Sequence, residues 1–176
     1  MVKKYVITGT CSSGKTTLIN MLNQSSYYTI GEVASYLIEG ELKKQNEERV
    51  LPWTNLHEFQ KRVALLQKEW EEEIPSFINT AILDRSKIDG LAYCSESNIK
   101  TPKELDKICK NTDYEKVFLL EPLQEHKQTK IRREDKNKAL ELNKHLTNAY
   151  KQKGYEPIRV PAIEPQERLE FILKSM

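Results

Sequence analysis

The stretch Gly9-Thr10-Cys11-Ser12-Ser13-Gly14-Lys15-Thr16 matches the phosphate-loop pattern G-x-x-x-x-G-K-[ST] at every position. The apolar run Tyr5-Val6-Ile7 precedes it, and a helical pattern follows it over residues 18–22. In this setting the backbone N–H groups of the loop and the positive end of the helix both face a bound polyphosphate. We therefore expect a first strand over residues 4–8 and a first helix over residues 14–23.

Each position of this loop has a predicted role toward a nucleoside triphosphate. We expect Lys15 to reach the β- and γ-phosphates and the hydroxyl of Thr16 to ligate Mg²⁺. The other predicted nucleotide-binding residues are Gly9, Cys11, Ser12, Ser13, Gly14 and Thr17. The alternative is a glycine-rich turn that merely caps a helix.

Strand-like and helical patterns alternate along the rest of the chain. Apolar runs predict strands over residues 27–30, 81–83, 117–120 and 157–160. Helices are predicted over residues 33–38, 56–70, 142–150 and 165–174, with another that starts near residue 101. This alternation indicates an α/β domain whose parallel sheet is covered on both faces. We expect the 176 residues to form a single domain.

The composition argues against several classes of protein. Lysine and arginine number 28 against 26 acidic residues, and a net charge of only +2 does not favour a nucleic-acid binder. No apolar run approaches the ~20 residues of a membrane span, and no signal peptide is evident. The scattered cysteines Cys11, Cys94 and Cys109 are typical of reduced thiols in a cytoplasmic protein. The histidines also lie far apart, which argues against a zinc site.

Two carboxylates follow predicted strands, where ligands bind in parallel sheets. Asp84 is predicted to hold the metal shell or to activate an acceptor, and the alternative is a helix N-cap. Glu32 is a candidate general base that also binds the acceptor, and the alternative is an acid favoured by a helix dipole. Arg85 is expected either to grip a substrate or to pair with Asp89 on the surface.

Two further segments are candidates for contact with the reactants. The cation-rich stretch 125–138 is predicted to be part of a mobile lid over residues 122–138, in which Arg132 or Arg133 stabilises the transferring phosphoryl group. The alternative is a solvated charged face. Gln60 and Gln67 are predicted to hydrogen-bond a substrate base or sugar, although such glutamines are more often surface residues.

With these features in place, the chain resembles a family of small AAA-type predicted ATPase/kinase proteins that includes the ribosylnicotinamide kinase part of a bacterial NAD-biosynthesis regulator. More widely it resembles nucleoside and nucleotide kinases. The matching pieces include residues 9–17, Gly31-Glu32, Phe59-Gln60, Asp84-Arg85 and Arg132-Arg133, in the family's order. The resemblance implies a phosphate-loop NTPase fold, a five-stranded parallel sheet in the order 2-3-1-4-5, an arginine-bearing lid, and Mg-ATP as donor.

Three functional hypotheses remain open from the sequence. The first is an ATP-dependent kinase for a small nucleoside- or nucleotide-like acceptor. The second is a regulatory module that binds ATP or GTP and hydrolyses it slowly. GTP is the weaker choice because Asn143-Lys144-His145-Leu146 departs from the guanine-reading pattern N-K-x-D at its last position. The third is a kinase of nucleic-acid 5′-hydroxyl ends, which the near-neutral charge disfavours.

Overall fold

The computed structural model describes residues 2–45, 49–123 and 130–176, and within the last range it describes side chains from residue 137 onward. The strands are β1 (Lys3–Gly9), β2 (Tyr28–Ile30), β3 (Thr80–Asp84), β4 (Tyr114–Leu120) and β5 (Ile158–Val160). The helices are α1 (Lys15–Gln24), α2 (Val33–Leu42), α3 (Leu56–Glu72), α4 (Asp89–Glu96), α5 (Lys103–Ile108), α6 (Lys130–Gln152) and α7 (Pro165–Ser175).

The strands form one five-stranded sheet in the order β2-β3-β1-β4-β5, and every neighbouring pair is parallel. This confirms the expected fold class and strand order. β1 lies at the centre, and Ile7 is in register with Asp84 of β3 on one side and with Phe118 of β4 on the other. The loop that follows β1 therefore emerges beside the carboxyl end of β3.

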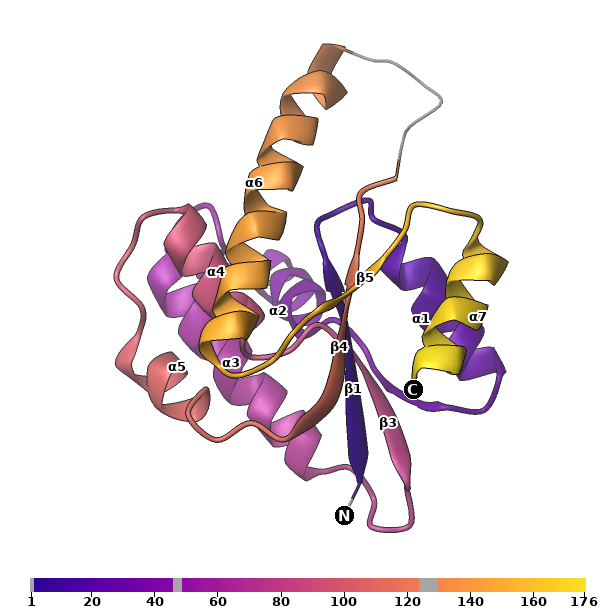
Figure 1. Ribbon diagram of the computed structural model, residues 1–176. Coiled ribbons are helices and arrows are strands. Elements are labelled where there is room, and N and C mark those ends of the chain that lie inside the picture. The colour runs from indigo at the N-terminus through magenta and orange to yellow at the C-terminus, as the bar shows by residue number, and fades with distance from the viewer. Residues whose placement is uncertain (1, 46–48, 124–129) are drawn as a thin grey trace.

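The two faces of the sheet are buried under different helices, as the alternation of side chains along a strand requires. Val6 and Leu83 belong to an apolar cluster that includes residues of α3, α4, α5 and α6. Ile7 and Ile82 point the other way, into a cluster with α1 and α7. Figure 1 shows α1 and α7 together on one side of the sheet and α3–α6 on the other. The predicted covering of both faces is confirmed.

Two helices differ from the predictions made from the sequence. α6 begins at Lys130, well before the predicted start at residue 142, and its first half extends away from the body of the molecule (Figure 1). α3 buries Phe59 as predicted, but the other residues on its buried face are Gln60, Ala64, Gln67 and Glu71. The predicted apolar stripe along α3 was therefore partly wrong, because polar side chains share the buried face.

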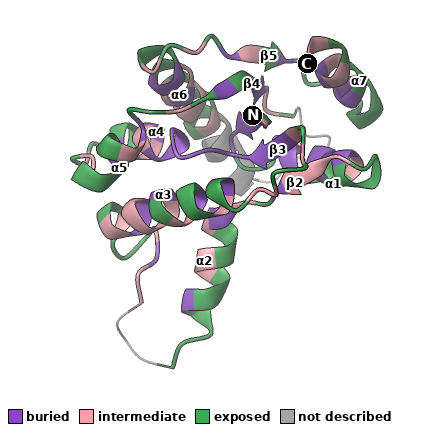
Figure 2. Cartoon of the chain, turned by 90° about the horizontal axis from the view of Figure 1, so that it is seen from below, coloured by how far each residue is buried: buried purple, intermediate pink, exposed green. Residues whose placement is uncertain are grey.

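Helix α2 is mostly exposed. Only Val33 and Glu41 of this helix are buried, and Figure 2 shows it projecting from the sheet with most of its surface exposed. Tyr36 of α2 packs edge-on against Trp70 of α3, with ring centroids 5.3 Å apart. Within the described chain, none of the helices has the length and apolar character needed to cross a membrane.

Candidate active site

The phosphate loop lies between the end of β1 and the start of α1, at the middle of the sheet. Ser12 and Gly14 have φ angles of 59° and 86°, so successive N–H groups can turn toward one hollow. Gly9 has a φ of 145°, and a Cβ there would lie 2.9 Å from the carbonyl oxygen of Leu120. No side chain caps α1, so its first N–H groups are available to an anion.

Lys15 is the buried cation of this loop. Its side chain folds back so that the ammonium donates to the carbonyl oxygens of Gly9 (3.0 Å) and Thr10 (2.7 Å). Burial, followed by repulsion from Arg85, lowers the pKa of Lys15 to about 8. Four of the seven other predicted nucleotide-binding residues are exposed, namely Cys11, Ser12, Thr16 and Thr17. A bound polyphosphate would therefore offset the cost of burying the ammonium.

Asp84 lies at the carboxyl end of β3 and is only 5% exposed. Its Oδ1 atom is buried and has no hydrogen-bond partner among the described residues. Burial, together with the nearby charge of Glu32, raises its pKa to about 6. A buried carboxylate oxygen without a partner fits a hard cation, for which carboxylate and hydroxyl oxygens are suitable ligands.

Magnesium fits this arrangement better than a metal held by protein alone. The described residues contain no group of three or more His, Cys, Asp or Glu side chains able to hold a metal ion. Mg²⁺ commonly binds through one or two protein ligands, waters and substrate phosphates. Asp84 and the exposed Thr16 are therefore the residues that would hold it, with phosphate oxygens and water completing the shell.

Arg85 connects the loop with the second carboxylate. It is buried, at 7% exposure, and has the left-handed φ of 70°. Its Nε donates to Oε1 of Glu32, and its Nη1 donates to the carbonyl oxygen of Gly9 (2.9 Å) and to Oδ2 of Asp89 (3.2 Å). The pair with Asp89, one of the two alternatives from the sequence, is present, but it is buried and does not lie on the surface. The guanidinium of Arg85 holds Glu32 against the phosphate loop.

Glu32 keeps its charge in this environment. It precedes α2 as the N-cap residue, and Oε2 accepts a hydrogen bond from the hydroxyl of Ser35 (2.7 Å). Burial opposes ionisation of Glu32, but Arg85 and Ser35 outweigh it and hold the pKa below its usual value. The half-buried Glu32 therefore presents a carboxylate, beside Asp84, to the space above the phosphate loop.

A buried hydrogen-bond network centred on Asp89 supports Arg85. Asp89 accepts from Thr8 through Oδ2 (2.7 Å) and from the hydroxyl of Tyr150 through Oδ1. The hydroxyl of Tyr150 also lies 2.8 Å from that of Ser86. The sequence analysis placed Tyr150 in a predicted helix without giving it a role in the site, and neither Thr8 nor Ser86 was singled out. No local pattern marks them, because they meet only when β1, β3, α4 and α6 come together.

Tyr93 is another residue that sequence reasoning missed. It lies on α4, where its ring covers the guanidinium of Arg85 at 5.7 Å. Burial, partly offset by Arg85, raises its pKa. An aromatic face against a buried guanidinium adds a favourable cation–π contact. Tyr93 thus helps to fix the arginine that holds Glu32.

The two predicted substrate-binding glutamines have different environments. Gln60 of α3 is 4% exposed, and a Cβ added at Gly90 of α4 would lie 3.1 Å from its Oε1. The amide of Gln67 instead donates to Glu71 at 3.3 Å, away from the phosphate loop. Neither is a surface residue, so the alternative from the sequence was wrong for both. Gln60 remains a candidate for substrate contact.

The predicted lid falls largely outside the described side chains. Residues 124–129 are not described, and Arg132 and Arg133 lie in the part of α6 whose side chains are not described. The backbone of residues 130–138 is helical, as the first part of α6. The role of these two arginines therefore stays a prediction.

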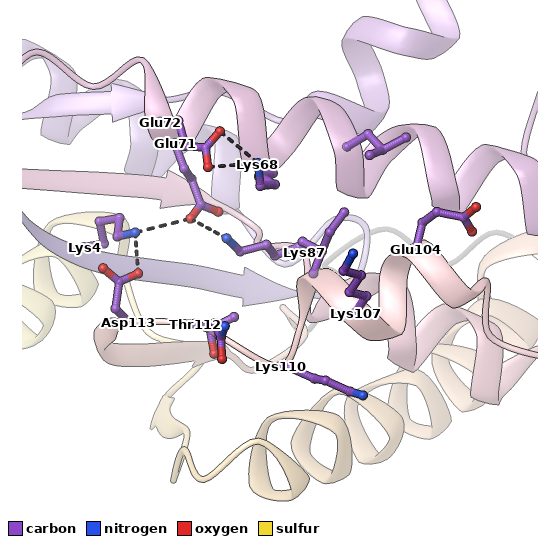
Figure 3. A pocket seen from close by; sticks show the side chains of 13 residues that line it. Lys4, Lys68, Glu71, Glu72, Lys87, Glu104, Lys107, Lys110, Thr112 and Asp113 are labelled. Carbon is purple, nitrogen blue, oxygen red and sulfur yellow. Dashed lines mark hydrogen bonds and ion pairs between the residues drawn. The ribbon is translucent and has the colours of Figure 1, made fainter.

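A separate hollow of about 890 Å³ opens beside the amino ends of β1 and β4, between α3 and α5 (Figure 3). Its buried floor is an ion-pair cluster in which Glu71 lies 3.1 Å from Lys87 and 3.5 Å from Lys4. The hydroxyl of Tyr114 donates to the same carboxylate at 2.9 Å. This lining is of mixed charge and lies away from the phosphate loop, so the hollow is not the candidate active site.

The fold and the loop together define a phosphate-loop protein with the architecture of nucleoside and nucleotide kinases. A family-model comparison matches residues 4–168 to the AAA domain family AAA_28, and the chain belongs to that family. A comparison with curated proteins found no significant match.

Several solved structures are similar to the chain in fold. The structure of NadR protein in complex with NR has a TM-score of 0.72 and 17% sequence identity, over 99% of this chain and 49% of that one. The present chain thus spans about half the length of the NadR protein. Deoxyadenosine kinase from M. mycoides has a TM-score of 0.64 and 17% identity, over 98% and 97% of the two chains. Thymidylate kinase from Candida albicans has a TM-score of 0.62 and 14% identity, over 99% and 90%.

Proposed function

We propose that this protein transfers the γ-phosphoryl group of Mg-ATP to a small nucleoside- or nucleotide-like acceptor. The observation that carries this proposal is that Lys15 and Arg85 both donate to the carbonyl oxygen of Gly9, while Arg85, which directly follows Asp84, also donates to Glu32. These contacts bring Lys15, Asp84 and Glu32 close enough for their charges to act on one another. Phosphoryl transfer depends mainly on positioning and on neutralisation of charge, and these are the groups it requires.

The donor half of the site is formed by the loop and by Asp84. Lys15 would exchange its carbonyl partners for phosphate oxygens, while the N–H groups from Gly9 to Thr17 would hold the polyphosphate chain. Thr16 and Asp84 would hold Mg²⁺, which when bound neutralises the developing charge. Arg132 or Arg133 would supply a further cation from the amino-terminal part of α6.

The acceptor half of the site is formed by Glu32 and Gln60. Glu32 would accept a hydrogen bond from the attacking hydroxyl and orient it toward the γ-phosphorus. Arg85 would serve the acceptor chiefly by holding Glu32, because its Nε and Nη1 donors are already engaged. Gln60 would hydrogen-bond a base or sugar. An acceptor of this class is consistent with the kinases that share the fold, and the free cysteines are consistent with a cytoplasmic enzyme.

The test is ADP release from Mg-ATP in the presence of a panel of nucleosides, nucleotides and their vitamin-derived analogues. At least one acceptor is expected to accelerate ADP release well above the acceptor-free rate, and Lys15→Ala is expected to abolish that gain. Slow release that no acceptor changes would instead support the regulatory ATPase hypothesis. Full activity of Lys15→Ala, with its fold verified by circular dichroism, would contradict both.

A further inference from the structure

Arg168 of α7 makes an unusual set of contacts beneath the phosphate loop. The residue is 2% exposed, and its guanidinium donates to backbone carbonyl oxygens from three separate segments. Nη1 donates to Ser13, Nη2 to Glu121 at 2.7 Å, and Nε to Pro161 at 2.6 Å. One side chain thus joins the loop after β1 to the ends of β4 and β5.

This guanidinium has no carboxylate partner within ion-pair distance among the residues that the structure describes. The carboxylate of Glu121 acts on it only at longer range, and it lies 3.9 Å from Arg159. Burying a charge with only carbonyl dipoles as partners is costly, because dipoles replace its hydration incompletely. The three carbonyl contacts, and not the filling of space, are therefore what an arginine contributes here.

The contact with Ser13 fixes the direction of a particular N–H group. In a planar trans peptide, the C=O of Ser13 and the N–H of Gly14 point in opposite directions. Arg168 pulls the Ser13 oxygen toward α7, so the Gly14 N–H must point away from α7. That direction leads into the hollow of the loop, where a phosphate oxygen would accept the bond.

Gly14 is matched to this arrangement in two ways. Its φ of 86° favours glycine, and a Cβ there would lie only 3.2 Å from Nη1 of Arg168. The guanidinium therefore approaches the loop as closely as a residue without a side chain permits. Gly14 and Arg168 therefore pack closely against each other.

We propose that Arg168 is a positioning residue for the donor nucleotide, acting through the Ser13–Gly14 peptide to aim the Gly14 N–H at a phosphate. The inference rests on the proposed function, since it requires that the loop binds a nucleoside triphosphate. Arg168 itself does not touch the nucleotide. Its effect is expected on the affinity for Mg-ATP and not on the affinity for the acceptor.

The test compares Arg168→Lys and Arg168→Met with Lys174→Met. Lys174 also contributes a positive charge from α7, but its side chain is 80% exposed and lies far from the loop contacts. The dissociation constant for Mg-ATP, measured by calorimetry, is expected to rise at least tenfold in Arg168→Met and less in Arg168→Lys. It should stay within twofold in Lys174→Met. The KM for the acceptor should be unchanged in all three.

The outcomes separate the two proposals. If the wild-type protein binds no Mg-ATP, the proposed function fails. If the wild type binds Mg-ATP but Arg168→Lys and Arg168→Met bind it as tightly as the wild type does, the positioning role is wrong, whatever the melting temperatures of the variants. If neither variant folds, hydrogen exchange of the Gly14 amide in the wild type decides the matter. Slower exchange with Mg-ATP is expected, and an unchanged rate would overturn the inference.

Discussion

At the scale of the residue, the site is defined by charges that are buried before any ligand arrives. Lys15 and Asp84 are 6% and 5% exposed, and burial shifts the pKa of each toward neutrality. Arg85 stands between them and Glu32 with a backbone conformation that non-glycine residues seldom adopt. Buried charges and a strained backbone both lower the stability of the folded protein, and both are typical of sites that are organised for binding.

The lowered pKa of Lys15 predicts how Mg-ATP affinity depends on pH. The polyphosphate favours the ammonium form, so binding at pH values above about 8 must take up a proton that the free site has lost. The association constant is therefore expected to be flat from pH 7 to 8 and to fall up to about tenfold per pH unit above that. Calorimetry in buffers of different ionisation enthalpy would measure both the proton uptake and the association constant. A flat profile to pH 9.5 would contradict the expectation.

The raised pKa of Asp84 predicts a gain in stability when its charge is removed. A folded-state pKa near 6, above the usual 3.8, means that the contribution of Asp84 to stability is most favourable below about pH 4, becomes less favourable as the pH rises from about 4 to 6, and stays so at higher pH. Asp84→Asn should therefore be more stable than the wild type by roughly 2–3 kcal/mol at pH 7, with the difference shrinking toward pH 4. Urea denaturation at both pH values measures this.

Asp106→Asn is the matched control, because Asp106 carries a side chain that is 55% exposed. Its stability should be close to that of the wild type at both pH values. Asp84→Asn should at the same time lose most of the acceptor-stimulated ADP release. A variant that is destabilised at pH 7 would show that Asp84 has a structural role instead.

At the scale of the element, strand ends and helix starts bring the reacting groups together. β1 and β3 run parallel and in register at Ile7 and Asp84, so the loop and the carboxylate emerge side by side. α4 and α6 supply Asp89 and Tyr150, which meet beneath Arg85. The network is therefore shared by elements that are separated in the sequence by up to 142 residues, from Thr8 to Tyr150.

The close approach of β1 and β4 predicts that one methyl group added at Gly9 has a large effect on stability. A Cβ at Gly9 would lie 2.9 Å from the backbone oxygen of Leu120, and the φ of 145° is also unsuited to alanine. Gly9→Ala is expected to lower stability by roughly 2–4 kcal/mol, through overpacking and backbone strain. Thermal and urea denaturation measure the change.

Gly40→Ala provides the comparison within the same chain. Gly40 lies inside α2 and has no atom within 4 Å of an added Cβ. Alanine there is expected to raise stability by roughly 0.5–1 kcal/mol, because it lowers the entropy cost of forming the helix. Equal effects of the two substitutions would show that the approach to Leu120 is unimportant.

At the scale of the whole molecule, the sequence predicts the architecture better than the site. The phosphate-loop motif and the alternating patterns were enough to predict the α/β fold, with Lys15 in the loop between β1 and α1. They were not enough to predict that Gln60 and Gln67 are buried, because apolar periodicity says nothing about which polar groups find partners inside. No role in supporting the site was assigned to Tyr150 or Arg168 from the sequence, since their contacts lie 61 and 155 positions away along the chain.

The near-neutral charge of the whole chain predicts weak binding to nucleic acid. A net charge of +2 leaves few cations to release counterions from a phosphate backbone. Fluorescence anisotropy with a labelled single-stranded oligonucleotide should show no binding at micromolar protein and 150 mM salt. Tight, strongly salt-dependent binding would favour a kinase of nucleic-acid ends over one for small acceptors.

The tie between Ser13 and Arg168 also bears on how the protein is made. The nucleotide loop is translated 155 residues before the arginine that completes it. A nascent chain that has formed β1, β3 and α1 therefore still lacks the contact between Arg168 and the phosphate loop. Arrested chains that stop before Pro165 should fail to retain nucleotide on the ribosome, so that the polypeptide becomes competent to bind its donor only after α7 has been made.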